Sequence, residues 1–309
     1  MARLKQYESL IRLGTSTWTY PEWKDIVYHK PYNKKSIRTE SLAEYAAFPP
    51  FSTVGIDNTF YAPPNPFIFE AYAKYLPEGF RCVSKVWQEI TVPKWPKHKR
   101  YGNKAGTVNP NFLSVEKFIM EILKVYDDVF REHAGPLVLE FGEMYPPTIP
   151  SLQFFLEKLE EFLSELPTDF QYAVEIRNRG FLQPSYFELL RKYNVAHVFN
   201  HWTKMPKLSE QMKVAGDPPF TADFAVARLL TPLGVNYANA VKMNAPYDKI
   251  KQRLPEMRLD IEAMIDQALA SNTLLYLLVN NRTEGCAPLT IMEMDACMRD
   301  KLSSVSSKQ

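Results

Sequence analysis

A glutamate and an arginine lie two residues apart in the segment Gln171-Tyr172-Ala173-Val174-Glu175-Ile176-Arg177-Asn178. Successive side chains of a β-strand point to opposite faces, so Glu175 and Arg177 share the face of Ala173. A charge on an interior face is costly unless it is paired or used. The segment predicts either a buried structural ion pair or part of a catalytic site, in which the neighbouring arginine keeps Glu175 ionised as a base or ligand.

Polar and aromatic side chains follow the other expected strands as well. The candidates for catalysis are Glu175, Arg177, Lys85 and Asp57, and the candidates for ligand binding are Trp18, Tyr20, Trp23, Asn58, Tyr61, Asn178, Arg228, Asn280 and Asn281. A rim so rich in aromatic rings is typical of a lined pocket. Arg177 and Arg228 can each bind a phosphate or a carboxylate in a bidentate manner, and either can instead pair with Glu175.

These side chains need a scaffold that brings the ends of several strands together. Short β-branched or aromatic segments predict strands at 11–17, 52–57, 80–86, 136–141, 171–177, 195–200, 224–229 and 273–280. Amphipathic segments between them predict helices near 40–47, 66–75, 112–131, 150–165, 184–193, 203–213, 250–270 and 286–302. The order favours an α/β fold, a TIM-like (β/α) barrel of parallel strands with outer helices, over an open doubly wound sheet.

Length and composition describe an ordinary globular protein. The chain has 309 residues, a net charge of +2 and a hydrophobic fraction of 46%. No linker divides it, so we expect one barrel domain at 1–302 and a disordered tail at 303–309. Three cysteines without CxxC spacing, no signal peptide and no apolar run of about 18 residues predict a cytoplasmic protein that does not enter membranes.

Three chemistries fit the candidate residues. A divalent metal could be held by Asp57, Glu140, Glu175 and His201, although the sequence has no HExxH or cysteine cluster and we expect no cofactor. Acid and base catalysis without a metal would use Glu175, with Lys85 or Arg177 adjusting its pKa. Walker A, GxGxxG and GxSxG motifs are absent from the sequence, which gives no support to nucleotide hydrolysis, dinucleotide redox chemistry or serine hydrolysis.

The third chemistry rests on a basic segment. Residues 93–104 contain five cationic residues and two aromatic ones, Trp95 and Tyr101. Such a segment is typical of a positively charged lid that attracts a phosphorylated substrate or a nucleic-acid backbone, and also of a solvated loop without a partner. The nearly neutral whole chain favours a single phosphate contact over broad nucleic-acid binding.

The strand-end segments resemble the domain of unknown function 72 family, also called YecE-like. The resemblance rests on Gly-Thr-Ser-Thr-Trp-Thr-Tyr at 14–20, Thr-Val-Gly-Ile-Asp-Asn-Thr-Phe-Tyr at 53–61, Arg-Cys-Val-Ser-Lys-Val at 81–86, Ala-Val-Glu-Ile-Arg-Asn at 173–178, Val-Ala-Arg-Leu at 226–229 and Tyr-Leu-Leu-Val-Asn-Asn at 276–281. It implies a TIM-like barrel, distantly similar to the xylose isomerase and endonuclease IV barrels. It implies no settled activity.

This chain departs from the pattern of that family. The family usually has a Glu and an Asn in the second-strand motif, where this chain has Gly55 and Asp57. Two family histidines are replaced here, one by Val92 and one, in a His-Gly pair, by Leu230. If relatives use these histidines in catalysis, the activity of this chain is altered or lost.

The sequence thus leaves two functional interpretations open. The preferred one is an enzyme that binds a small phosphate- or carboxylate-bearing ligand, a sugar-like one included, at the C-terminal end of the barrel. The alternative is a non-catalytic binding protein or nucleic-acid-associated factor that uses the basic segment at 94–104. Neither the substrate nor the oligomeric state follows from the sequence.

Overall fold

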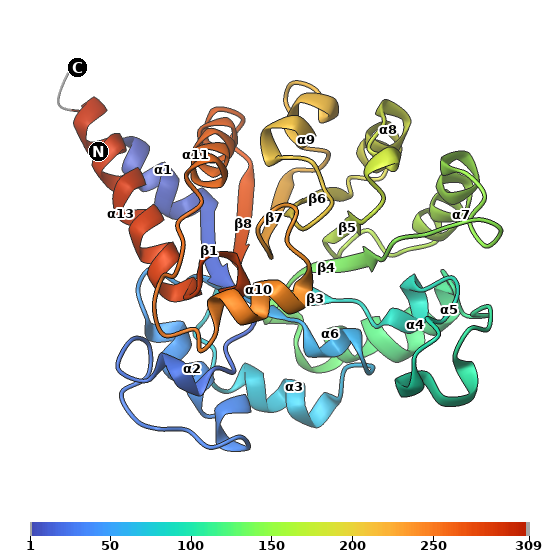
Figure 1. Ribbon diagram of the computed structural model, residues 1–309, viewed down its shortest axis with the longest axis horizontal. Coiled ribbons are helices and arrows are strands. Elements are labelled where there is room, and N and C mark those ends of the chain that lie inside the picture. Colours follow the sequence, from blue (N-terminus) through green and yellow to red (C-terminus); the bar gives the residue numbers. More distant parts are fainter. Residues whose placement is uncertain (1, 307–309) are drawn as a thin grey trace.

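The computed structural model describes residues 2–306, with side chains up to residue 304, and has a sheet of eight parallel strands at its centre (Figure 1). The strands are β1 (Ile11–Thr15), β2 (Thr53–Ile56), β3 (Arg81–Lys85), β4 (Ala134–Phe141), β5 (Tyr172–Ile176), β6 (Ala196–His201), β7 (Phe224–Leu229) and β8 (Leu274–Val279). From β2 to β8 each strand pairs with the next, and β8 pairs with β1. The predicted TIM-like (β/α) barrel is confirmed, and each strand lies where the sequence placed it.

The barrel is nearly closed at a seam between β1 and β2. Leu13 forms an isolated bridge with Phe51, and no continuous ladder joins the two strands. The hydroxyl of the fully buried Tyr45 accepts a hydrogen bond from the Thr15 amide (2.8 Å) and donates one to the Thr53 carbonyl (3.2 Å). This side chain thereby satisfies backbone groups that the missing ladder would otherwise leave unpaired.

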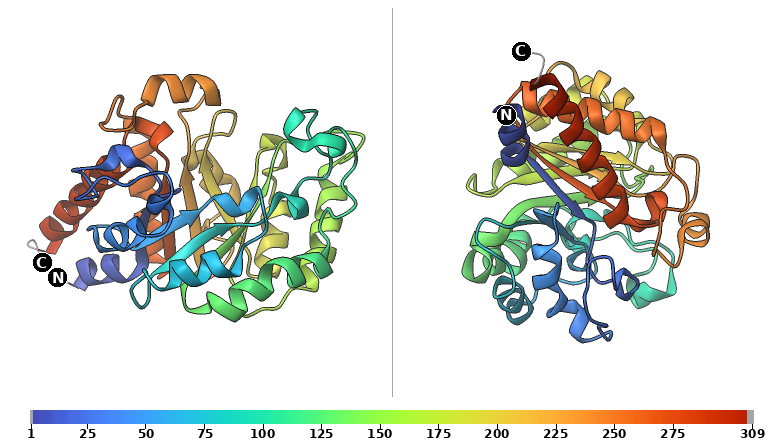
Figure 2. Two further views of the ribbon diagram at one scale, coloured as in Figure 1. Left: turned by 90° about the horizontal axis from the view of Figure 1, so that it is seen from below. Right: turned by 90° about the vertical axis from the view of Figure 1, so that its left-hand side faces the viewer.

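Helices surround the strands on the outside, as both views in Figure 2 show. They are α1 (Ala2–Leu10), α2 (Ser41–Ala47), α3 (Pro66–Ala73), α4 (Gln88–Thr91), α5 (Val115–Phe118), α6 (Lys124–Val129), α7 (Leu152–Ser164), α8 (Pro184–Lys192), α9 (Leu208–Ala215), α10 (Tyr237–Asn244), α11 (Pro255–Ala270), α12 (Asn281–Glu284) and α13 (Ala287–Ser306). The first and last helices lie side by side, and Tyr7 of α1 donates a hydrogen bond to Asp295 of α13 (2.9 Å).

The helices differ from the expectation in several places. The sequence did not predict α1, α10 or the short helices α4 and α12, and the expected helix at 112–131 is divided into α5, a π-helical turn at Ile119–Leu123 and α6. In addition, α13 continues past residue 302 to Ser306, so the first part of the predicted tail is helical, while residues 307–309 lie outside the described part of the chain. No helix within the described residues is long and apolar enough to cross a membrane.

Two apolar layers hold the strands in place. One face of each strand packs against the helices, and the other points into the barrel, where Val83, Val138, Ala173, Val226 and Leu278 belong to one buried cluster. Because side chains alternate along a strand, the next inward position after each of Val83, Val138, Ala173 and Val226 lies near the carboxyl end of its strand. Those positions hold charged residues, and they form the candidate site.

Candidate functional site

Arg228 lies at the centre of a charged network at the carboxyl ends of the strands. Its Nη2 atom lies 3.0 Å from both carboxylate oxygens of Asp57, which follows β2. Its Nη1 atom contacts Glu140 of β4 at 2.9 Å and also donates a hydrogen bond to Glu175 of β5. Burial alone would lower the pKa of Arg228, but Asp57, Glu175 and Glu140 outweigh burial and raise it, so the guanidinium stays charged.

Glu140 is the carboxylate on which the cations converge. Its Oε2 atom lies 2.8 Å from Lys85 Nζ, 3.2 Å from Arg177 Nη2 and 2.9 Å from Arg228 Nη1. Burial would raise the pKa of Glu140, but Lys85, Arg177 and Arg228 hold it well below its ordinary value. Glu140 is therefore an ionised structural acceptor and a weak base. From the sequence, Glu140 was expected only as a possible metal ligand. Its position two residues after Val138 nevertheless places it on the inward face of β4.

Glu175 and Arg177 form the ion pair that their spacing along the strand predicts. Arg177 Nη2 lies 2.5 Å from Glu175 Oε1, and the Glu175 side chain has no solvent exposure. Three cations and three carboxylates thus make up the network, and their formal charges cancel. Both arginines are used mainly to neutralise carboxylates, and this arrangement reduces their capacity to bind an anion.

Solvent reaches this network from one side. The Asp57 side chain is 28% exposed and that of Glu140 is 14% exposed, whereas that of Arg228 is 2% exposed. Two of the cations contact aromatic rings at this side: Lys85 Nζ lies 4.5 Å from the Phe60 ring centre, and Arg177 lies 4.6 Å from that of Trp202. Asp57 is therefore the edge of the network that a ligand would meet first.

A second group of aromatic residues follows β1 and β7, and Arg282, which follows β8, contacts it. The Tyr20 ring lies 5.5 Å from that of Tyr247, and Arg282 lies 4.6 Å from the Tyr237 ring centre. Burial raises the pKa of the Tyr20 hydroxyl to about 12, with Arg282 opposing the shift and Asp57 adding to it. Tyr20 is therefore a neutral hydrogen-bond donor at pH 7, between Arg282 and the network.

Some predicted binding residues are instead part of the core. Trp18 is 2% exposed and packs edge-on against Tyr72 with the ring centres 5.1 Å apart. Trp23 is fully buried and contacts both Tyr20 and Tyr28. These tryptophans support the loop after β1 and do not present a face to a ligand.

The predicted asparagines are engaged in local structure. Asn178 exchanges two hydrogen bonds of 2.9 Å with the backbone of Met144 and so joins the loops after β4 and β5. Asn280 caps α12 by accepting from the Arg282 amide (3.0 Å), and Asn281 accepts from the Ala287 amide (2.8 Å). Asn58 is exposed on the loop after β2. None of the four extends the charged network.

The ligand set that the sequence suggested for a metal does not assemble. On β6, Asn200 continues the inward face of Val198, so His201 points outward, where its Nδ1 atom lies 2.9 Å from the Thr231 carbonyl. The Arg228 guanidinium contacts all three remaining carboxylates and stands where a cation would be. Within the described residues, no three His, Cys, Asp or Glu side chains are grouped as metal ligands.

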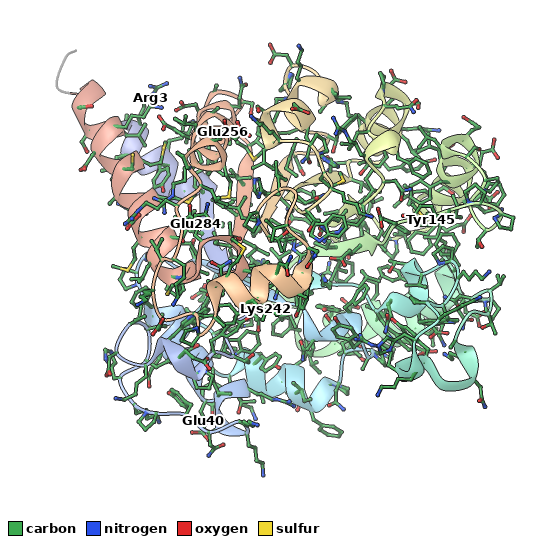
Figure 3. All side chains as sticks on the ribbon, viewed as in Figure 1. Arg3, Glu40, Tyr145, Lys242, Glu256 and Glu284 are labelled. Atoms are coloured by element: carbon green, nitrogen blue, oxygen red, sulfur yellow. The ribbon has the colours of Figure 1, made fainter. Side chains whose placement is uncertain are left out.

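The basic segment lies beside this end of the barrel. Arg100 stacks over Tyr61 of the β2 loop at 5.8 Å, and Tyr61 is 61% exposed. Residues of the basic segment and of the loop after β4 line a cavity of about 460 Å³, whose wall includes Trp95 and Tyr145. Tyr145 lies at the edge of the molecule near α7 (Figure 3). Part of the positive charge is neutralised, because Lys104 pairs with Glu89 at 2.9 Å.

Comparison with known proteins identifies relatives but no activity. Residues 12–309 match the family described as "Protein of unknown function DUF72". The crystal structure of a DUF72 family protein from Thermotoga maritima superposes with a TM-score of 0.61 at 18% identity, covering 94% of this chain and 99% of that one. One from Enterococcus faecalis gives a TM-score of 0.59 at 17% identity, covering 94% and 98%. No functionally curated protein matches. At such identities the structures support the fold alone.

Proposed function

Since the chain belongs to the DUF72 family, whose description names no activity, we propose from its own geometry that it is an enzyme acting on a small, hydroxyl-rich ligand that carries a carboxylate or phosphate group. The observation that carries the proposal is the exposure of Asp57 at the edge of an otherwise buried charged network. A fixed carboxylate beside aromatic rings suits a sugar-like ligand, because it accepts hydrogen bonds from hydroxyl groups while the rings cover apolar faces.

Lys85 and Arg282 would hold the acidic group of the ligand. Lys85 carries three donor hydrogens, and the contact with Glu140 uses one of them. Arg282 Nε has no hydrogen-bond partner within the described residues. Arg177 Nη1 is likewise without one, so a ligand oxygen could satisfy a donor that is costly to leave unpaired.

A proton transfer in this site would use a carboxylate as the base and a phenol hydroxyl as the hydrogen-bond donor. Asp57 would accept a proton from a ligand hydroxyl or an adjacent carbon, held in position by its two contacts with Arg228. Tyr20, with a pKa raised by burial to about 12, is protonated at neutral pH and would donate a hydrogen bond to the developing oxyanion.

A panel of sugar acids and sugar phosphates tests this proposal. Thermal shift identifies binders, and NMR of the incubated ligand detects turnover. We expect Asp57→Asn to lower kcat/KM by about 100-fold or more while the protein remains folded. The matched control is Asp223→Asn, because Asp223 is an exposed aspartate immediately before β7, at the opposite end of the barrel. Full turnover by Asp57→Asn, or neither binding nor turnover across the panel, would contradict the proposal.

The alternative is contact with a nucleic-acid backbone through residues 94–104. The stacking of Arg100 on the exposed Tyr61 favours it, since a cation and an aromatic face together suit single strands. Titration of a labelled oligonucleotide at two salt concentrations, with and without Lys97→Gln, Lys99→Gln and Arg100→Gln, tests it. Equal affinity of the two proteins at both concentrations would exclude this role.

A cytosolic location is also part of the proposal. Cys82 and Cys286 are buried and unpaired, and Cys297 is exposed and unpaired. Free thiols suit a reducing compartment. Fractionation of cells that express the untagged chain would test the location.

A further inference from the structure

A second cavity lies at the opposite end of the barrel, where the strands begin. It has a volume of about 390 Å³ and is lined by the first residues of β1, β3, β4 and β8 and by the segment that enters β5. Its volume falls within the range of small-molecule sites. α1 leads into β1 at this end (Figure 1). Nothing in the network described above reaches this cavity, because the apolar layer of the barrel interior lies between them.

Two arginines and a tyrosine face the inside of the barrel here. Arg12 of β1 is paired in register with Tyr276 of β8, and directly paired residues of neighbouring strands point to the same side. Arg81 shares the inward face of Val83 on β3. All three side chains line the cavity.

The two arginines have no carboxylate partner within the described residues. Arg12 donates a hydrogen bond of 3.3 Å to the Glu8 carbonyl, and Arg81 donates two, of 3.1 and 2.9 Å, to the carbonyls of Arg131 and Ala134. Carbonyl groups are neutral, so neither charge is paired with an acid among these residues; Arg12 is half-buried and Arg81 is open to solvent. Arg131 and Asp169 also line the cavity, but they neutralise each other: Arg131 pairs with Asp169 at 2.5 Å and with Asp127 at 3.2 Å.

Tyr276 supplies a neutral donor to the same cavity wall. Burial raises the pKa of its hydroxyl to about 12, although Arg81 and Arg12 act to lower it. The hydroxyl is therefore protonated at pH 7, and it makes no hydrogen bond to another described residue. Two guanidinium groups and one hydroxyl converge on the same space, which suits an oxyanion with several acceptor atoms.

We propose that this cavity binds the phosphate group of a small phosphomonoester. A phosphate dianion matches the charges of Arg12 and Arg81, and its oxygens can accept bidentate hydrogen bonds from the planar guanidinium groups. The cavity is larger than a phosphate group requires, and the remaining space would hold the esterified part. The site is separate from the one that we propose for catalysis.

Isothermal titration calorimetry with inorganic phosphate and with glycerol 3-phosphate tests this inference on the full chain. We expect both to bind, the ester more tightly. Arg12→Gln should weaken binding by about tenfold, as expected when a charge-assisted hydrogen bond is lost. Tyr276→Phe removes only the hydroxyl and should weaken binding by about threefold. The control is Arg179→Gln, because Arg179 is 69% exposed on the loop after β5, at the other end of the barrel.

Each outcome decides a part of the proposal. No heat of binding for either probe at millimolar concentration, or equal losses for Arg12→Gln and Arg179→Gln, would overturn it. Equal affinities for phosphate and glycerol 3-phosphate would rule out a phosphomonoester as the preferred ligand and would indicate a site for free phosphate. Arg12→Lys keeps the charge with a similar side chain, so recovery of part of the affinity would show that the loss in Arg12→Gln reflects the charge and not the fold.

Discussion

The two ends of the barrel interior use the same kind of residue in opposite ways. At the carboxyl ends of the strands, Arg228 contacts three carboxylates, and the charges of the whole network cancel. At the amino ends, Arg12 and Arg81 line a cavity and, among the described residues, form hydrogen bonds only with backbone carbonyls. An arginine that faces the barrel interior is therefore no evidence of anion binding by itself, because its neighbours decide whether its charge is available.

Strand β3 contains both situations. Arg81, Val83 and Lys85 follow one another on its inward face, at the beginning, middle and end of the strand. Lys85 pairs with Glu140 at 2.8 Å, whereas Arg81 has no acidic partner within the described residues. We therefore expect that removing a charge at the carboxyl ends of the strands lowers the stability of the fold. Removing a charge at the amino ends should instead weaken ligand binding.

The largest effect is expected at Arg228. Arg228→Met should lower the free energy of unfolding by about 3–5 kcal/mol, because it leaves three neighbouring carboxylates without their common cation. Urea denaturation followed by circular dichroism measures the change. Adding Glu175→Gln to Arg228→Met should recover part of the loss by removing one of the uncompensated charges. A variant as stable as the wild type would show that the network does not hold this end together.

Acid should have an intermediate effect at the carboxyl ends of the strands, through Glu140. The folded protein holds the pKa of Glu140 well below its ordinary value, so the unfolded chain takes up the proton first. The contribution of Glu140 to stability is therefore present above its unfolded pKa, about 4.5, and is lost as the pH falls below that value.

Unfolding curves recorded between pH 7 and pH 3 test whether stability falls with pH in this direction. Glu140→Gln cannot titrate, so its stability should fall less steeply below about pH 4.5 than that of the wild type. Arg12→Gln is the control from the other end, and it should keep the slope of the wild type. Identical slopes for all three proteins would show that Glu140 is not the group whose protonation weakens the fold.

The smallest effect is expected at Arg12. Arg12→Gln should change the free energy of unfolding by less than about 0.5 kcal/mol, since the side chain makes one long hydrogen bond to a carbonyl and no ion pair among the described residues. Urea denaturation without phosphate measures it. A loss as large as that of Arg228→Met would remove the contrast between the two ends.

The fold could be predicted almost completely from the sequence. The eight strands were found because apolar and β-branched runs are short and regularly spaced, and helix α7 because Ser151 precedes an amphipathic run and caps it, accepting from the Phe154 amide at 3.1 Å. Helices α1 and α10 were missed because few of their side chains are buried. Asn236 caps α10 by accepting a hydrogen bond from the Asn239 amide (3.0 Å). An asparagine at this position is an N-cap signal from which the start of α10 could have been predicted.

The candidate site was predicted only in part. Glu175, Arg177, Lys85, Asp57 and Arg228 do converge, because alternation and a parallel barrel bring the ends of their strands together. Trp18 and Asn178 do not join them. A tryptophan that packs inward and one that lines a pocket look alike in a sequence, and an asparagine gives no sign of whether its amide bonds to the backbone or remains free.

The sequence by itself determined which residues face the interior and at which end, since period-two alternation depends on neighbours along the chain. Only the tertiary structure decided which charges are neutralised. Arg228 pairs with Glu140, 88 positions away, and with Asp57, 171 positions away, while Arg12 has no acidic partner in the described part of the chain. Coulomb interactions depend on distance in space, and that distance is fixed only when the barrel closes.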